Sequence, residues 1–126
     1  SVQNQVKQAF FSDQLYFWKI SQNDTIIAYA FLDNVKGKSM PITFMVILNK
    51  NGTIINSSVI KYRESYGGEI GNRRWLEQFN KKNKKSSYEP GKEIDGITGA
   101  TISVNSLSKG IRKIVLLFDQ VKDNLE

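Results

Sequence analysis

A regular spacing of apolar residues near the C-terminus constrains the fold more than any other feature of this sequence. From residue 104 onward, apolar side chains recur at alternating intervals of three and four positions: Val104, Leu107, Ile111, Ile114, Phe118, Val121 and Leu125. This spacing places all of these side chains on one face of an α-helix. The pattern therefore predicts a long amphipathic C-terminal helix, which must bury its apolar face against another layer.

Four apolar segments in the first half of the chain predict that second layer. The expected strands cover residues 15–20, 25–32, 41–48 and 53–62, with turn-forming residues at 21–24 and at Asn51-Gly52. The segment 41–48 is nearly continuous in apolar residues, so we expect a central strand that is covered on both faces. Short connections favour an antiparallel β-meander, which needs helices packed on it. The expected fold class is therefore α+β.

The remaining segments complete a single expected domain over residues 1–126. Residues 1–14 carry apolar residues at helical spacing and are expected to form a short helix or a linker. A short helix over 70–79 should pack Trp75 and Phe79 inward. A lysine-rich loop over 80–91 and a brief strand over 92–94 are expected to connect this helix to the C-terminal one.

The composition excludes several kinds of functional site. The chain has no Cys and no His, so zinc sites of the Cys/His type, thiol redox motifs, Cys-ligated iron–sulfur clusters and Ser-His-Asp triads are unavailable. Redox chemistry would therefore need a bound organic cofactor. No segment approaches the roughly 20 consecutive apolar residues of a membrane-spanning helix.

The net charge of +6 raises the question of an acidic partner. Much of the excess lies in Lys81, Lys82, Lys84 and Lys85. Such a cluster is typical of a surface for nucleic acid, anionic lipid or an acidic redox partner, or of a solvated loop. We favour the solvated loop and expect no nucleic-acid partner, because no aromatic or glycine pattern of a nucleic-acid-binding module accompanies the lysines.

A glycine- and hydroxyl-rich segment directly precedes the predicted C-terminal helix. Residues 95–103 read Asp-Gly-Ile-Thr-Gly-Ala-Thr-Ile-Ser. Gly96 and Gly99 permit a tight loop, and the hydroxyls of Thr98, Thr101 and Ser103 lie where the helix should begin. Spacing alone leaves two interpretations open: the hydroxyls cap the helix, or the free N–H groups of its first turn bind an anion.

The segment 95–101 resembles the flavinylation motif of the FMN-binding domain family. That family includes the periplasmic subunits of sodium-pumping NADH:quinone oxidoreductase and of Rnf-type complexes. The resemblance implies that FMN is joined through a phosphoester to Thr101 by a dedicated flavin transferase, with Asp95, Thr98, Gly99 and Ala100 also at the cofactor. Asp95 would organise the loop as a hydrogen-bond acceptor or be recognised by the transferase; on spacing alone, it could equally be an Asx-turn residue.

A second segment, 64–67, is similar to the Glu-Thr-Pro-Gly-like loop that follows the last meander strand in this family. Here Ser65 replaces Thr and Tyr66 replaces Pro, which changes the stiffness of the loop. The resemblance implies that Glu64, Ser65 and Gly67 lie at the isoalloxazine ring. Glu64 could hydrogen-bond the ring edge or pair with Arg63 or a nearby lysine.

The resemblance implies the function of an extracytoplasmic flavoprotein electron carrier without catalytic turnover of its own. Its expected partners are a flavin transferase and the redox proteins of a membrane electron-transport system. The chain begins at Ser1 rather than Met, and we expect a signal peptide or membrane anchor outside this sequence. The alternative is a flavin-free, basic envelope or ligand-binding module of the same fold.

Overall fold

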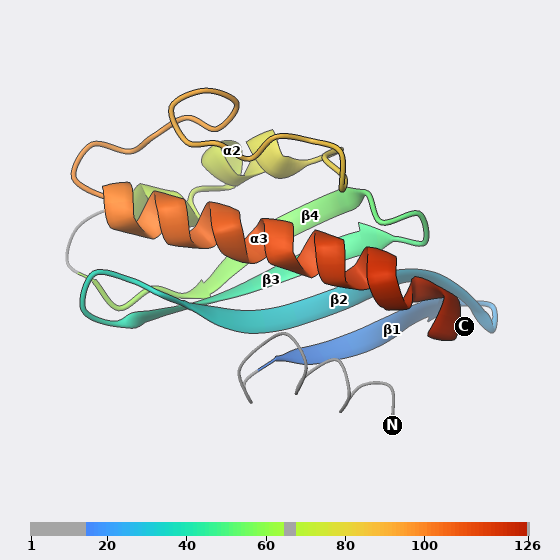
Figure 1. The fold of residues 1–126 in the computed structure, drawn as a ribbon. Coiled ribbons are helices and arrows are strands. Elements are labelled where there is room, and N and C mark those ends of the chain that lie inside the picture. Colours follow the sequence, from blue (N-terminus) through green and yellow to red (C-terminus); the bar gives the residue numbers. More distant parts are fainter. Residues whose placement is uncertain (1–14, 65–67, 126) are drawn as a thin grey trace.

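A four-stranded antiparallel sheet and a long helix across it form the centre of the structure, a computed structural model that describes residues 15–64 and 68–125. The strands are β1 (Tyr16–Gln22), β2 (Thr25–Lys36), β3 (Pro41–Asn49) and β4 (Ile54–Lys61), in the order β1-β2-β3-β4. Helix α3 (Thr101–Val121) lies across this sheet (Figure 1). The expected α+β fold with a β-meander and a long C-terminal helix is confirmed.

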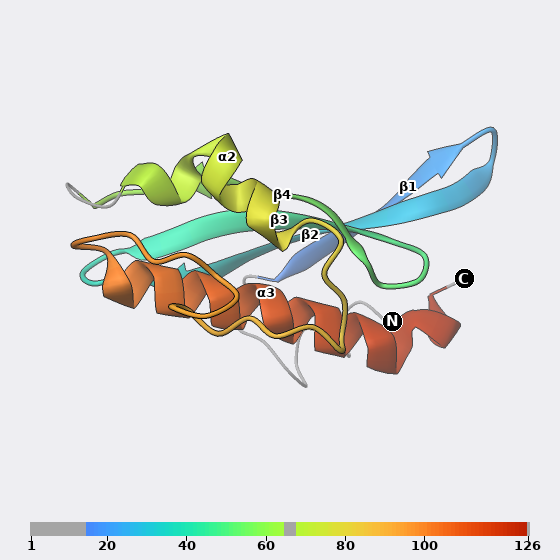
Figure 2. The ribbon, with the colours of Figure 1, turned by 90° about the horizontal axis from the view of Figure 1, so that it is seen from above.

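Short helical turns lie along the β4 edge of the sheet. They are η1 (Gly68–Gly71), α2 (Arg73–Leu76) and η2 (Glu77–Phe79), and all three contact β4. Seen from above, α3 runs on one side of the sheet while the segment containing α2 borders β4 (Figure 2). A last turn, η3 (Lys122–Asn124), follows α3. In the described residues, no helix has the length and apolar character needed to cross a bilayer.

The apolar face predicted for the C-terminal helix is the face that the core covers. Leu107, Ile111, Ile114 and Phe118 have no exposed surface, and only Val121 is half-buried. The ring of Phe118 lies 5.1 Å from that of Tyr29, measured between centroids. The periodicity therefore predicted the contact surface correctly, because side chains three and four residues apart share a helix face.

Strand β3 is central, but its two faces are not equally covered. Its buried side chains alternate along the strand, at Ile42, Phe44, Val46 and Leu48, and belong to the core that α3 completes. Met45 and Ile47, on the opposite face, are only partly buried. The expectation of coverage on both faces is met fully on the face toward α3 and only in part on the other, because α3 is the helix of the described chain that packs on β2 and β3.

Strand β2 extends four residues beyond its expected end at Leu32. Asp33 and Asn34 continue the ladder, where they pair with Phe44 and Thr43 of β3. The Asp33 side chain is buried and accepts a hydrogen bond from the backbone N–H of Asn34 at 2.8 Å. Burial raises the pKa of the Asp33 carboxyl above its ordinary value. The sequence did not predict this extension, because Asp and Asn are depleted in strands.

The connecting segments differ from expectation at two further points. Ser21 and Gln22, expected in a turn, belong to β1 and pair with Ile26 and Thr25. Residues 92–94 do not form a strand; the chain turns there and closes with an isolated bridge between Pro90 and Ile94. Ile94 is nonetheless fully buried. The short helix expected over 70–79 is confirmed as η1, α2 and η2. Phe79 is buried and Trp75 is half-buried, and their ring centroids lie 5.5 Å apart. The predicted helix or linker over 1–14 lies outside the described residues.

At Gly110, α3 packs tightly against side chains of β2 and β3. A Cβ at this position would lie 2.5 Å from Val35 Cγ1 and 3.1 Å from Phe44 Cζ. We expect Gly110→Ala to be destabilising by about 1 kcal/mol in denaturant unfolding, since overpacking of roughly 1–3 kcal/mol exceeds the gain of about 1 kcal/mol in helix propensity. Gly96→Ala is the control, because a Cβ there meets no atom of the described residues within 4 Å. A more stable Gly110→Ala protein would contradict the close packing.

Candidate functional site

A cavity of about 700 Å³ opens at the N-terminal end of α3. Four separate stretches of the chain form its walls: the β2–β3 turn, the residues after β4, η1, and the loop that begins α3. The lining residues are Lys38, Ser39, Tyr62, Glu64, Glu69 and the run from Thr98 to Ser103. Residues far apart in the sequence therefore meet at the segment that the motif predicted.

Thr101 is the first residue of α3, and its side chain is exposed at the wall of this cavity. The helix is capped by Ala100, whose side chain has no acceptor, and the first bond along α3 runs from Val104 N–H to Ala100 O at 2.9 Å. The N–H groups of Thr101, Ile102 and Ser103 precede that bond. The start of α3 thus offers amide donors and the positive end of a 21-residue helix dipole.

The interpretation of Thr101 as a helix cap is wrong, because the N-cap position belongs to Ala100 and carries no side-chain hydrogen bond. Gly99 makes this start of the helix possible. Its φ of +81° is in the left-handed region, which residues with a Cβ adopt only at a cost of roughly 1–2 kcal/mol. The loop leaves the Thr101 hydroxyl free of a capping role.

Glu64 lies in the cavity wall and holds the β2–β3 turn. Its Oε1 accepts hydrogen bonds from the N–H groups of Ser39 at 2.6 Å and Met40 at 2.8 Å. These two bonds, with a smaller contribution from the charge of Lys38, lower the pKa of the Glu64 carboxyl below its ordinary value of 4.5. The sequence offered the flavin ring, Arg63 or a lysine as its partner, whereas the structure pairs it with two backbone amides.

This arrangement predicts an acid-dependent contribution of Glu64 to stability. A carboxyl whose pKa is lower in the folded than in the unfolded protein stabilises the fold above its unfolded pKa. That contribution is lost as the pH falls through the folded pKa. We expect an NMR titration midpoint for Glu64 below 4.5, and a weaker acid dependence of unfolding in Glu64→Gln. A midpoint at or above 4.5 would contradict the two amide bonds.

Asp95 lies apart from the cavity and acts through its backbone. Its N–H donates to Gln78 Oε1 at 2.8 Å, and its carbonyl oxygen accepts from Trp75 Nε1 at 2.9 Å. These bonds attach the start of the loop to the segment containing α2. The Asp95 side chain is exposed, and its carboxylate has no hydrogen bond to another described residue. The structure therefore brings Thr98, Gly99, Ala100, Thr101 and Glu64 together, but leaves Asp95 outside this group.

Several residues at the site carried no signal in the sequence. Lys38, Tyr62 and Glu69 line the cavity because the β2–β3 and β3–β4 registers bring their segments to the end of α3. Trp75 and Gln78 hold the loop from outside. Only the indole N–H of Trp75, which usually finds an acceptor when buried, could have suggested such a role. Ser65 and Gly67, predicted at the ring, lie outside the described residues.

The cavity fits the mononucleotide that the resemblance implies. Its volume falls within the range of about 300–1,000 Å³ that small-molecule and cofactor sites occupy. The amides at the start of α3 suit a phosphate, and the Thr101 hydroxyl lies beside them. Tyr62 and Ile102 add apolar surface that could cover part of a planar ring system. Size, donors and apolar surface therefore all match FMN.

Comparison with known proteins agrees with this geometry. The model of the FMN-binding domain family matches residues 37–115, which is more than half of the chain and includes every lining residue of the cavity. No curated protein matches the chain. The matched region extends from the β2–β3 turn into the second half of α3, and it identifies FMN as the cofactor.

Proposed function

Because this chain belongs to the FMN-binding domain family, we propose that it is an extracytoplasmic electron carrier whose FMN is joined to Thr101 by a phosphoester. The observation that carries the proposal is the exposed hydroxyl of Thr101 at the wall of the cavity and at the start of α3. Flavin binding follows from the family. The covalent bond, the carrier role and the location are the proposal.

Without a covalent bond, this site would hold FMN only weakly. An anion at an exposed helix N-terminus gains typically ~0.3–1 kcal/mol from the helix dipole. Among the described lining residues, Lys38 is the one cation, and Glu64 and Glu69 are both acidic. Such a site would release a free mononucleotide on dilution. A phosphoester prevents this loss, which matters most outside the cytoplasm, where we expect no local supply of FMN.

Thr101 is well placed for such a bond. Its Oγ1 would form a bond to the flavin phosphorus and lose its proton, while one phosphorus–oxygen bond of the donor breaks and the leaving oxygen takes up a proton. Relative to protein plus free FMN, the product is therefore lighter by one water. Ala100, directly before it, is small and leaves room for a phosphate next to the backbone. The resulting diester keeps one negative charge beside the amides of Thr101, Ile102 and Ser103, where the helix dipole favours it.

Bound FMN supplies one- and two-electron redox chemistry, and the chain sets its orientation and surroundings. Glu64 holds the β2–β3 turn against the cavity, while Trp75 and Gln78 hold the loop before α3. The sequence offers no His and no Cys as an acid–base or nucleophilic partner for turnover. These features favour a carrier between redox proteins of a membrane electron-transport system, matured by a flavin transferase.

The test is co-expression with a flavin transferase of the Rnf or sodium-pump type, followed by intact mass and absorbance measurements. We expect a mass increment of one FMN minus one water, and a yellow colour that stays with the acid-precipitated protein. The absorbance should bleach with dithionite and return in air. A protein that stays colourless with the transferase present would reject the carrier and favour the flavin-free binding module.

A further inference from the structure

A second cavity, of about 460 Å³, lies between the loop over 85–90 and the middle of α3. It shares no lining residue with the cavity at Thr101. Ser108, which lines it, follows Thr101 by two helical turns, or about 10 Å along the axis. The loop contributes Lys85, Ser86, Ser87, Tyr88, Glu89 and Pro90, and α3 contributes Ser108, Lys109 and Arg112.

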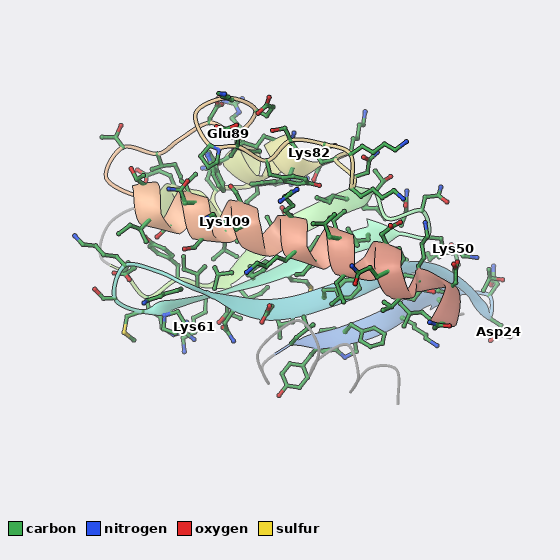
Figure 3. The ribbon with its side chains drawn as sticks, in the orientation of Figure 1. Asp24, Lys50, Lys61, Lys82, Glu89 and Lys109 are labelled. Atoms are coloured by element: carbon green, nitrogen blue, oxygen red, sulfur yellow. The ribbon has the colours of Figure 1, made fainter. Side chains whose placement is uncertain are left out.

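The charge in this cavity is predominantly positive. Lys109 and Arg112, three residues apart on α3, line one wall, and Lys85 lines the wall formed by the loop. Within the described chain, none of these three cations has an ion pair, whereas the one lining carboxylate, Glu89, pairs with Lys92 at 3.7 Å. Figure 3 labels Lys109 on α3 and Glu89 on the loop above it. The cations are therefore available to a ligand.

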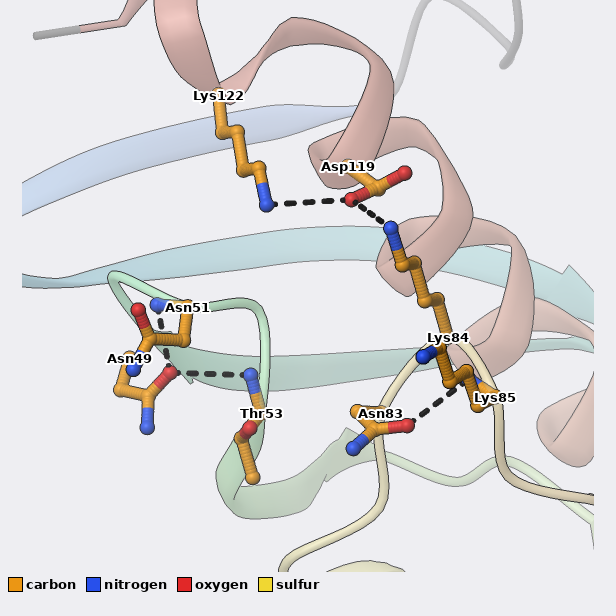
Figure 4. A network of polar contacts seen from close by, with 8 residues as sticks. All are labelled: Asn49, Asn51, Thr53, Asn83, Lys84, Lys85, Asp119 and Lys122. Atoms are coloured by element: carbon orange, nitrogen blue, oxygen red, sulfur yellow. Dashed lines mark hydrogen bonds and ion pairs between the residues drawn. The ribbon is translucent and has the colours of Figure 1, made fainter.

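The loop that forms one wall is held in place by its own lysines. Lys84 Nζ lies 3.0 Å from Asp119 Oδ1 of α3 (Figure 4), and Lys82 Nζ donates to the carbonyl oxygen of Ser87 at 2.9 Å. Tyr88 is buried and donates its hydroxyl to the carbonyl oxygen of Asn83 at 2.9 Å. The lysine-rich segment, expected to be a solvated loop, is thus attached to α3, and the cavity is formed before any ligand binds.

Ser108 provides the independent sign of a ligand. Its side chain is only 1% exposed, and its Oγ has no hydrogen-bond partner among the described residues. A buried hydroxyl without a partner is destabilising, and alanine is the better helix former at such a position. Buried polar groups without a partner are rare in folded proteins, and a ligand at the adjoining cavity explains this one. Ser108 lies one turn before Arg112 on the same helix face.

We propose that this cavity binds a multiply charged oxyanion, a phosphoryl or pyrophosphoryl group, between Lys85, Lys109 and Arg112. The planar guanidinium of Arg112 can bind two phosphate oxygens at once, and the two ammonium groups add donors that are not tied to one geometry. A small movement of α3 or of the loop would bring the Ser108 hydroxyl to the anion. This site does not depend on the flavin, because its residues do not line the first cavity.

The test is isothermal titration of the full chain with sodium pyrophosphate at low ionic strength. We expect the double variant Lys109→Gln/Arg112→Gln to lose at least tenfold in affinity. Ser108→Ala should bind several-fold more weakly while unfolding at a higher temperature, a combination that a purely structural serine would not produce. Lys61→Gln, which removes an exposed charge from β4, should change affinity less than twofold. Circular dichroism verifies that each variant is folded.

A second arm identifies the source of the anion. Vesicles of phosphatidylglycerol, with phosphatidylcholine as the neutral control, are mixed with the same variants. Binding of vesicles that depends on Lys109 and Arg112, without binding of pyrophosphate, would assign the site to a lipid headgroup and still support it. Binding of either probe that is equal in the wild type and the double variant would overturn the proposal. An equal loss of affinity in Lys61→Gln would also overturn the proposal, because it would indicate general charge attraction.

Discussion

Replacing Thr101 by alanine should abolish covalent flavinylation completely. The substitution removes the Oγ1 through which the proposed phosphoester forms, while Ala100, Gly99 and the amides at the start of α3 remain. Alanine is also a good first residue for a helix, so the fold should be preserved. After co-expression with the transferase, the intact mass of Thr101→Ala should equal that of the unmodified chain, and its acid pellet should be colourless.

The matched control is Thr98→Ala. Thr98 lines the same cavity and is also exposed, but it lies three residues earlier, in the loop before the helix. Its variant should keep the full mass increment. Retention of the increment in Thr101→Ala, or its transfer to Thr98, would reject the assignment of Thr101. Reversible binding of FMN to Thr101→Ala would still be consistent with the family, because the cavity and its amide donors are unchanged.

The largest expected effect on stability is that of Phe118→Ala. Phe118 is fully buried, with its ring 5.1 Å from that of Tyr29 and 6.1 Å from that of Phe31. Removing a buried phenyl ring typically costs 3–5 kcal/mol, from lost burial and from the cavity left behind. The free energy of unfolding of such a domain is about 5–15 kcal/mol, so Phe118→Ala would remove a large fraction of it. Denaturant unfolding should show a lower midpoint.

Two variants control for this effect. Phe118→Leu keeps most of the apolar volume and should cost less than the alanine substitution, because part of the contact with Tyr29 and Phe31 remains. Ile102→Ala removes an exposed side chain on the same helix and should change the free energy of unfolding by less than about 1 kcal/mol. A loss below about 1 kcal/mol in Phe118→Ala would show that α3 does not close the core as described.

The helices and strands of this fold could be predicted wherever the apolar residues kept one spacing along a segment. The three-and-four spacing after Val104 identified α3 and its buried face, and four short apolar segments identified the meander. Prediction failed where packing decided the outcome. Asp33 stays in β2 because its strand is already paired with β3, and residues 92–94 turn because the bridge from Pro90 to Ile94 closes them.

The site was predictable only along one segment of the chain. The motif at 95–101 identified Thr98, Gly99, Ala100 and Thr101, which do line the cavity. The partner of Glu64 was not predictable, since the two amides it binds are 24 and 25 residues away and reach it through the register of two hairpins. Charge alone suggested Arg63 or a lysine, because backbone amides carry no signal in a sequence.

The sequence by itself determined the fold class, the helix face and the threonine at the start of α3, because each of these depends on residues within a few positions of one another. The tertiary structure alone decided which distant residues complete the two cavities: Glu64 and Lys38 beside Thr101, and Lys85 opposite Arg112. The reason is physical. Side-chain periodicity is a local property of the backbone, whereas a cavity forms where strand register and helix packing bring separate segments together.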